Sequence, residues 1–450
     1  MVGLSAALLA STIAAPGAVL AQDAGMVDPM KCAGATVNIA LVAGERDELG
    51  LLDKEAEIEA ATGVNLEIST EALGDLNASN NQNLEAPESS VDIMHMIGFT
   101  VAQMVGADLM EPLQPYLDDP TKTPADYDFA DFPAGQLEYT GYFDVANGQF
   151  GGDTLYLIPG IHSGSVLLFY RSDLLGGEGQ PAVPTTWAEY LAAAEALTTD
   201  EIAGSAMVGA NDWSNFFVDW YTRFITTGGQ LTTGDKNDGT LQANLDSPEG
   251  IAALQNMIDL LPFSPAAVSS YTFTDALDAF SVGKVAMWPA WATIAGALFG
   301  PDSGVADKVA VAQVPADDGN PRAIRGGWGL GIPKNLSQER KDCAWHILTM
   351  ITSKDFEKYQ VMTYQTDPNR LSTAADAEVV AALPYIPEAV KAIETAQILE
   401  TANLPANFEM VALIAEQINL ALVGSQDAAT AMANAQAAVT DVLKRDGHQK

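Results

Sequence analysis

Strand and helix patterns alternate in the N-terminal part of this chain. Residues 36–43 form a nearly continuous apolar run, which is typical of a strand buried on both faces. Segment 48–61 has apolar residues at helical spacing, and 64–69 predicts the next strand. A second unit begins with a strand at 91–97 and a helix at 100–107. This alternation predicts an α/β fold with mostly parallel sheets flanked by helices, with ligands beyond the carboxyl ends of the strands.

Length indicates how many domains the chain can form, and charge excludes some classes of binding partner. The 450 residues leave room for two or three domains, and a hydrophobic fraction of 48% is that of a globular chain. The 59 acidic and 21 basic residues give a formal charge of −38. Phosphate binding needs clustered Lys and Arg, so this balance argues against nucleic acid and against an anionic membrane surface as partners.

The first residues predict export. Segment 4–21 is almost entirely small or apolar and ends in Val19, Leu20 and Ala21, a cleavage signature before Gln22. We therefore expect a signal peptide at 1–21 and a periplasmic mature chain. No later stretch has the ~18 uninterrupted apolar residues that a membrane span needs.

The chain has two cysteines, Cys32 and Cys343. In an oxidising compartment they can pair, and otherwise they are two separate buried thiols. Sequence spacing leaves both alternatives open, because pairing requires their Cα atoms to lie within about 7 Å.

Signals of catalysis are weak. The four histidines lack the spacing of metal ligands, and we find neither a phosphate-binding loop nor a nucleophile elbow. Carboxylates are so numerous that any pair chosen for glycoside hydrolysis would be arbitrary. The sequence therefore predicts no catalytic residue, no metal and no cofactor.

Tryptophans in unusual settings are the stronger signal. Trp288 and Trp291 flank a Pro-Ala pair in a predicted turn, Trp328 follows two glycines, and Trp213 begins the aromatic-rich segment 211–224. Aromatic faces match the apolar C–H faces of sugar rings, while polar groups at the rim bind the hydroxyls. The sequence therefore offers four candidate ligand contacts. Three further tryptophans are expected in the core: Trp187, Trp220 and Trp345.

The order and spacing of these motifs resemble the extracellular solute-binding proteins of sugar-uptake ABC transporters, the broad family that includes the maltose-binding protein. The resemblance spans essentially all of the chain after the signal peptide, in segments 36–44, 53–68, 91–113, 156–175, 184–197, 280–292, 325–334, 344–356 and 404–443. It implies a two-lobed fold with a ligand cleft at the hinge. Lobe 1 would comprise 22–115 and 316–370, lobe 2 would comprise 116–315, and 371–450 would form C-terminal helices mainly of lobe 2.

The same resemblance implies a set of ligand contacts. Its first lobe-1 loop, its lobe-2 ligand loop, its stacking aromatic, its G-G-W segment and its P-x-R element all have counterparts in this chain. Together with the tryptophans above, the predicted ligand-binding set is Glu45, Arg46, Phe99, His162, Ser163, Trp213, Trp288, Trp291, Gly326, Gly327, Trp328 and Arg370. It also places Cys32 and Cys343 on the same lobe, which favours a disulfide between them.

The function that the resemblance implies is the periplasmic, non-enzymatic, monomeric solute-binding component of an ABC importer. It would capture a sugar, oligosaccharide or polyol by domain closure and deliver it to membrane permease subunits. One alternative is a non-sugar or anionic solute, such as a sugar acid, sulfonated sugar, glycerol phosphoester or peptide, because Arg46, Arg325 and Arg370 offer positive charge. A secreted glycosidase is the alternative from another class.

Overall fold

The computed structural model describes residues 27–43, 46–160, 164–211 and 213–450. The predicted signal peptide lies outside these residues. None of the helices in the described ranges is long and apolar enough to span a bilayer.

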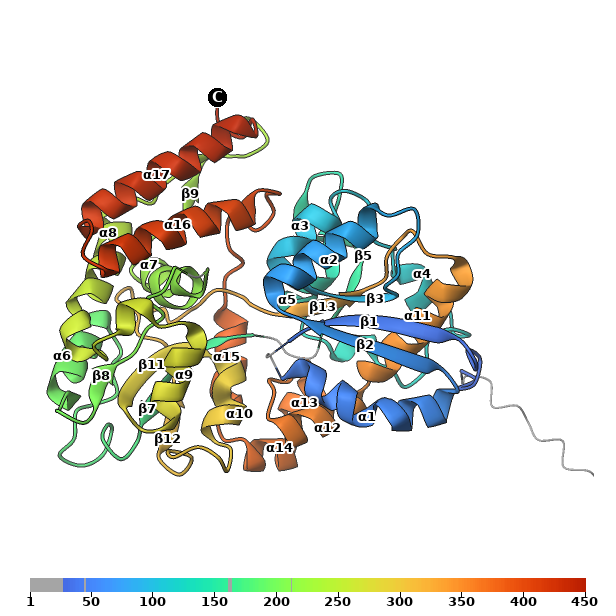
Figure 1. The fold of residues 1–450 in the computed structure, drawn as a ribbon, viewed down its shortest axis with the longest axis horizontal. Helices are drawn as coiled ribbons and strands as arrows, with labels where there is room; N and C mark the ends of the chain where they lie inside the picture. The colour runs from blue at the N-terminus through green and yellow to red at the C-terminus, as the bar shows by residue number, and fades with distance from the viewer. Residues whose placement is uncertain (1–26, 44–45, 161–163, 212) are drawn as a thin grey trace, which may run out of the picture.

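The first lobe is built on a five-stranded sheet of order β2-β1-β3-β13-β6 (Figure 1). β1 is parallel to β2 and β3, whereas β13 runs antiparallel to β3 and β6. The strands are β1 (Thr36–Val42), β2 (Asn65–Glu71), β3 (Ile93–Ile97), β6 (Leu157–Pro159) and β13 (Trp328–Gly331). The flanking helices are α1 (Asp47–Thr62), α2 (Leu73–Glu85), α11 (Gln338–Ile351) and α12 (Lys354–Tyr364).

The second lobe is built on a four-stranded sheet of order β12-β7-β11-β8. Its strands are β7 (Val166–Arg171), β8 (Ala203–Ser205), β11 (Val285–Trp291) and β12 (Val309–Ala312). Its helices include α6 (Trp187–Leu197), α8 (Pro248–Asp259), α9 (Phe273–Ser281) and α15 (Ile386–Thr395). The C-terminal pair, α16 (Asn407–Leu422) and α17 (Ala428–Arg445), packs on the same lobe (Figure 1). The two-lobed α/β fold is therefore confirmed, although both sheets are mixed, because β7 and β13 enter antiparallel to their neighbours.

The chain changes lobe later than predicted. It crosses from the first sheet to the second between Pro159 and Val166, and it returns between Ala312 and Trp328. The predicted start of lobe 2 at residue 116 is therefore wrong, because 116–159 includes β6, a strand of the first sheet. The prolines of this stretch break regular structure around the short helix α4 (Gln114–Leu117), and they do not mark a change of lobe.

A disulfide joins Cys32, just before β1, to Cys343 on α11. Their Cα atoms lie 5.6 Å apart, within the range that a disulfide spans. Both residues belong to the first lobe, so the predicted pairing is confirmed.

Candidate ligand-binding site

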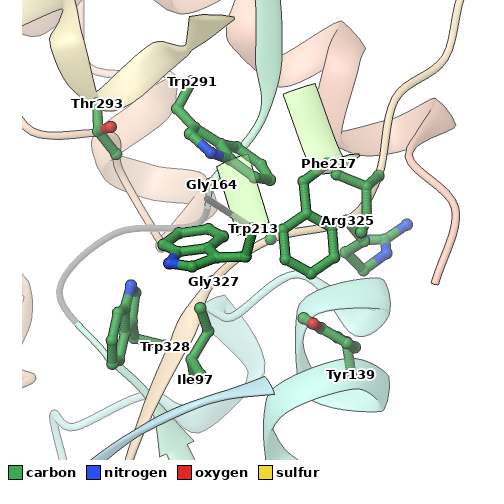
Figure 2. A pocket seen from close by; sticks show the side chains of 12 residues that line it. Ile97, Tyr139, Gly164, Trp213, Phe217, Trp291, Thr293, Arg325, Gly327 and Trp328 are labelled. Carbon is green, nitrogen blue, oxygen red and sulfur yellow. The ribbon is translucent and has the colours of Figure 1, made fainter. Parts of the chain in front are cut away.

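A pocket lies where the two lobes meet (Figure 2). β3 ends beside it at Ile97, so the pocket lies beyond the carboxyl end of a strand, where the α/β pattern predicted a ligand. The first lobe, the second lobe and the segments that cross between them all contribute. The pocket is lined by Ile97, Tyr139, Gly164, Trp213, Phe217, Trp291, Thr293, Ile324, Arg325, Gly326, Gly327 and Trp328.

Aromatic rings form most of the pocket wall. Tyr139 and Trp328 come from the first lobe, whereas Trp213, Phe217 and Trp291 come from the second. Trp213 and Phe217 meet edge to face, with their ring centroids 5.5 Å apart. In Figure 2 the rings of Trp213, Trp291 and Trp328 turn toward the same space. The wall is therefore suited to apolar ligand faces and is completed only when both lobes contribute.

Two of these rings sit on π-helices. Tyr139 belongs to the π-helix Leu137–Gly141 and Phe217 to the π-helix Asn215–Tyr221. The wider π turn occurs frequently at functional sites, and it redirects side chains that a regular α-helix would place elsewhere. Tyr139 also needs its neighbour to be small, because a Cβ at Gly98 would lie 2.3 Å from the ring.

Glycines bring the crossing segments together under the pocket. The Gly326 N–H donates to the Gly164 carbonyl at 3.2 Å. Gly164 has φ +61°, and a Cβ there would lie 2.8 Å from the Gly327 nitrogen. The two crossings are thus in direct backbone contact, which makes this point a candidate hinge.

Arg325 is the charged residue of the pocket lining. Its Nη2 donates to the Ala396 carbonyl at 3.0 Å, and a Cβ at Gly135 would lie 2.8 Å from its Nη1. Burial lowers the pKa of Arg325, while the nearby Glu138 carboxylate opposes this change. A guanidinium nevertheless stays protonated in proteins. Arg325 therefore brings a positive charge to the pocket lining, with Glu138 close enough to act on its pKa.

Little free space is left in the pocket. The space left between its side chains is about 40 Å³, room for about three water molecules. A sugar or polyol therefore needs the lobes to move apart before it can enter.

Five of the predicted ligand contacts line this pocket: Trp213, Trp291, Gly326, Gly327 and Trp328. Arg46 does not. It is half-buried, its Nε donates to the Tyr364 carbonyl at 3.0 Å, and it packs against Gly296 of the second lobe. Arg46 therefore bridges the two lobes. Four other predictions lie outside the described residues: Glu45, His162, Ser163 and the side chain of Phe99.

Trp288 lies in the core of the second lobe, not in the cleft. It sits inside β11 opposite Phe169 of β7, its side chain is fully buried, and it packs on Phe273 with ring centroids 5.2 Å apart. The predicted turn around Pro289 is in fact a strand. This proline is tolerated because β8 pairs with β11 only as far as Met287, so no neighbour needs an N–H from residue 289.

Arg370 is also a structural residue. Its side chain is fully buried, and it donates to the carbonyls of Thr352, at 2.7 and 3.0 Å, and Asp128, at 3.0 Å. The carboxylates of Asp131 and Glu357 lie 3.5 and 3.8 Å from it. This guanidinium holds the end of the first lobe together, so the prediction that it projects into the cleft is wrong.

Sequence reasoning missed several lining residues. Phe217 follows Trp213 by four residues within the aromatic-rich segment, and that spacing could have indicated it. Tyr139 had no comparable signal, since its segment was assigned to the other lobe. The lining residues outside the predicted set are Ile97, Tyr139, Gly164, Phe217, Thr293, Ile324 and Arg325.

Comparisons with known proteins agree with this architecture. A probable ABC transporter-binding protein of Deinococcus radiodurans is 28% identical over 317 residues, 68% of each chain. An erythritol/L-threitol-binding protein of Mycolicibacterium smegmatis is 23% identical over 269 residues, 58% of this chain and 55% of that protein.

Solved structures show the same fold. A ribitol-bound ABC transporter solute-binding protein of Agrobacterium radiobacter superposes with a TM-score of 0.80 at 22% identity, covering 91% of this chain and 99% of the other. The maltose-bound MalE3 of T. maritima superposes with a TM-score of 0.79 at 22% identity, covering 91% of this chain and 100% of the other. The sequence model of the family described as bacterial extracellular solute-binding protein matches residues 51–358, more than half of the chain. This chain therefore belongs to the bacterial extracellular solute-binding proteins.

Proposed function

We propose that this chain captures a carbohydrate, meaning a sugar, oligosaccharide or polyol, and delivers it to the membrane permease of an ABC importer. The observation that carries this proposal is the convergence of five aromatic rings from both lobes on one interlobe pocket. Aromatic faces stack on the C–H faces of sugars and polyols. Relatives with this fold have been solved with ribitol, D-mannitol and maltose, which supports the same class of ligand here.

The lobes should close on a ligand because each lobe supplies part of the pocket wall. Tyr139 belongs to the first lobe and Trp291 to the second, so a ligand can contact both rings only when the lobes are together. Its affinity for the closed form then exceeds its affinity for the open form, and binding shifts the population toward closure. The bound solute is released unchanged to the permease, because the chain acts by binding and not by catalysis.

Polar groups around the rings would bind the ligand hydroxyls. Thr293 and Arg325 line the pocket itself. Glu45, His162 and Ser163 remain predicted hydroxyl partners, and Phe99 remains a predicted contact. We further propose that the mature chain works in the periplasm as a monomer.

A second candidate ligand class is an anionic sugar. Arg325 favours it, because this cation lines the pocket. Arg325→Gln would then abolish binding of a sugar acid, whereas binding of a neutral sugar would change little. Lys334→Gln is the control, because Lys334 is an exposed residue that pairs with Asp108, and neither residue lines the pocket.

The first experiment is a thermal-shift panel on the chain from Gln22. The panel contains mono- and disaccharides, polyols, sugar acids, amino acids and oligopeptides, and calorimetry follows any hit. A ligand at about 100 times its dissociation constant adds about 2.7 kcal/mol of stability. We expect hits among the neutral sugars or polyols. A response to peptides or amino acids alone would discard the carbohydrate proposal, and turnover of a chromogenic glycoside would show an enzyme instead.

A further inference from the structure

The segment that leads to Trp213 is buried but irregular. Residues 206–209 follow β8, are buried in the second lobe and belong to no helix or strand. A buried stretch of this kind needs other hydrogen-bond partners for its backbone, because no regular ladder supplies them. It also fits tightly, since a Cβ at Gly209 would lie 2.2 Å from the Val268 carbonyl oxygen. We call residues 206–210 the anchor segment.

Two asparagine side chains hold carbonyls of the anchor segment. Asn215, which opens the π-helix Asn215–Tyr221, donates from Nδ2 to the Ala210 carbonyl at 2.8 Å. Asn419 of α16 donates from Nδ2 to the Gly209 carbonyl at 2.7 Å. The anchor segment is therefore fixed both to the helix that follows it and to the C-terminal helix pair. Neither of these bonds involves a charged group.

A charged side chain holds the Val208 N–H of the anchor segment. The fully buried Asp219 accepts from this N–H through Oδ2 at 2.9 Å. Its Oδ1 lies 3.3 Å from Nη1 of Arg223, which is equally buried. Arg223 is itself fixed, since its Nε donates to the Asn256 side chain at 2.9 Å and its guanidinium lies 4.4 Å from the ring centroid of Trp187. The Asp219 carboxylate thus joins the anchor segment to the core of the second lobe.

The anchor segment and Asp219 lie on either side of two pocket rings in the sequence. Trp213 follows the anchor segment by three residues, and Phe217 precedes Asp219 by two residues on the same π-helix. Both rings line the pocket and meet edge to face (Figure 2). A shift of the anchor segment against the π-helix would therefore move the wall that a ligand contacts. Asp219 can act on the ligand through these rings without touching it.

Asp219 differs from the two asparagines because it can change its charge. Burial raises the pKa of Asp219 to about 6, while the Arg223 guanidinium and the Val208 N–H oppose this change. In the described part of the chain, the charged or titratable groups that face it are Arg223 and Tyr190 of α6. A guanidinium stays protonated in proteins, and burial raises the pKa of Tyr190 above its usual 10. Between pH 5 and pH 8, Asp219 is therefore the member of this group that titrates.

We propose that Asp219 is a positioning residue of the ligand pocket: its ionised carboxylate holds the anchor segment in the arrangement that binds ligand, and protonation weakens binding. The physical reason is that a neutral carboxyl group no longer attracts Arg223 and is a poorer acceptor for the Val208 N–H than a carboxylate is. This inference rests on the proposed carbohydrate function and adds a proton-dependent control of affinity.

The test measures affinity for ribitol, D-mannitol and maltose by calorimetry between pH 8 and pH 5, with a melt at each pH to show that the protein is folded. Asp219→Asn keeps the size of the side chain and an acceptor oxygen but removes the charge. Asn419→Ala removes an uncharged anchor of the same segment. Asp173→Asn is the control, because Asp173 also pairs with an arginine of the second lobe, Arg171 at 2.6 Å, but follows the end of β7 that lies away from Gly164.

We expect wild-type affinity to fall about tenfold from pH 8 to pH 5, a size typical of coupled sites. Asp219→Asn should bind about tenfold more weakly than wild type at pH 8 and change little on acidification. Asn419→Ala should bind more weakly at every pH but keep the pH dependence of wild type. A general loss of packing would not separate the two variants in this way, and Asp173→Asn should match wild type.

Two results would overturn the role of Asp219 and leave the carbohydrate function standing. Parallel pH profiles of wild type and Asp219→Asn would show that another group controls the affinity. Should Asp219→Asn fail to fold, a pH-independent affinity of both wild type and Asn419→Ala would have the same meaning. A wild-type chain that binds no sugar or polyol at any pH would refute the carbohydrate function and the role of Asp219 together.

Discussion

The indole of Trp291 lies directly against the backbone of Gly326. A Cβ at residue 326 would stand 2.8 Å from Cζ3 of the ring, closer than real side-chain contacts allow. Trp291 ends strand β11 of the second lobe, whereas Gly326 lies in the crossing segment that returns to the first lobe. The position of a pocket ring is therefore coupled to the backbone of the candidate hinge.

Gly326→Ala should displace the Trp291 ring. Overpacking of this kind costs about 1–3 kcal/mol, and the moved ring should lower ligand affinity as well. Calorimetry and thermal melts of the variant measure the two effects. Gly74→Ala is the control, since a Cβ at Gly74 meets nothing within 4 Å. Normal affinity in Gly326→Ala would show that the ring position does not matter for binding.

The two neighbouring tryptophans of β11 should behave differently. Trp291→Ala should weaken ligand binding about thirtyfold, as truncation of a central contact does, with little change in the melting temperature of the ligand-free chain. Trp288→Ala empties a core position and should cost about 3–5 kcal/mol of stability. Equal effects of both substitutions on ligand affinity at a temperature where both variants are folded would contradict the assignment of Trp288 to the core.

Arg370→Gln should destabilise the first lobe without a specific effect on binding. Loss of one member of a buried charge cluster typically costs about 3–5 kcal/mol, because Asp131 and Glu357 are left without their cation. Denaturant unfolding measures this cost. A variant with wild-type stability and weakened ligand affinity would instead restore Arg370 to the cleft.

Reduction of the Cys32–Cys343 disulfide should lower the free energy of unfolding by about 2–4 kcal/mol. The bond closes a loop with a sequence separation of 311 residues, so its loss frees a long stretch of the unfolded chain. Melts with and without reductant test this, and the double variant Cys32→Ala, Cys343→Ala should match the reduced protein. An unchanged melt in reductant would argue against the bond.

His346 should make stability depend on pH. Its Nε2 lies 2.9 Å from the Pro29 carbonyl, and its Nδ1 is buried with no partner in the described part of the chain. Burial lowers the pKa of His346 below its usual 6.5. The unfolded chain therefore binds a proton at a higher pH than the folded chain does.

The sign of the effect follows from that difference. The contribution of His346 is fully present above pH 6.5 and is lost as the pH falls toward the lowered pKa, with a slope of at most about 1.4 kcal/mol per pH unit. His346→Gln should flatten the stability curve between pH 7 and pH 5. Parallel curves for the two proteins would show that His346 does not titrate in this range.

Local patterns predicted the elements well where neighbouring residues carry the signal. The strand predicted at 36–43 is β1, and the helix predicted at 48–61 is α1. The C-terminal helices expected within 371–450 include α16 and α17. Such signals act over a few residues, so they can be read from the sequence without knowledge of the fold.

Sequence patterns failed to predict side-chain positions that depend on contacts between distant segments of the chain. Trp288 and Trp291 look alike in sequence, but within strand β11 residues three apart face opposite sides, so Trp288 packs in the core and Trp291 lines the pocket. Tyr139 reaches the pocket only because its π-helix packs near Arg325, far along the chain. Arg370 is buried because carboxylates from two distant segments surround it.

The sequence by itself determined the α/β alternation, the helix boundaries, and Trp213, Trp291 and Trp328 as pocket candidates. Only the tertiary structure decided the lobe boundaries, the burial of Trp288 and Arg370, and the side chains that hold the segment before Trp213. The physical reason is the distance along the chain over which each interaction acts. Periodicity and capping are set by residues a few positions apart, whereas a site between lobes depends on which distant surfaces pack together and which face each strand or helix presents to them.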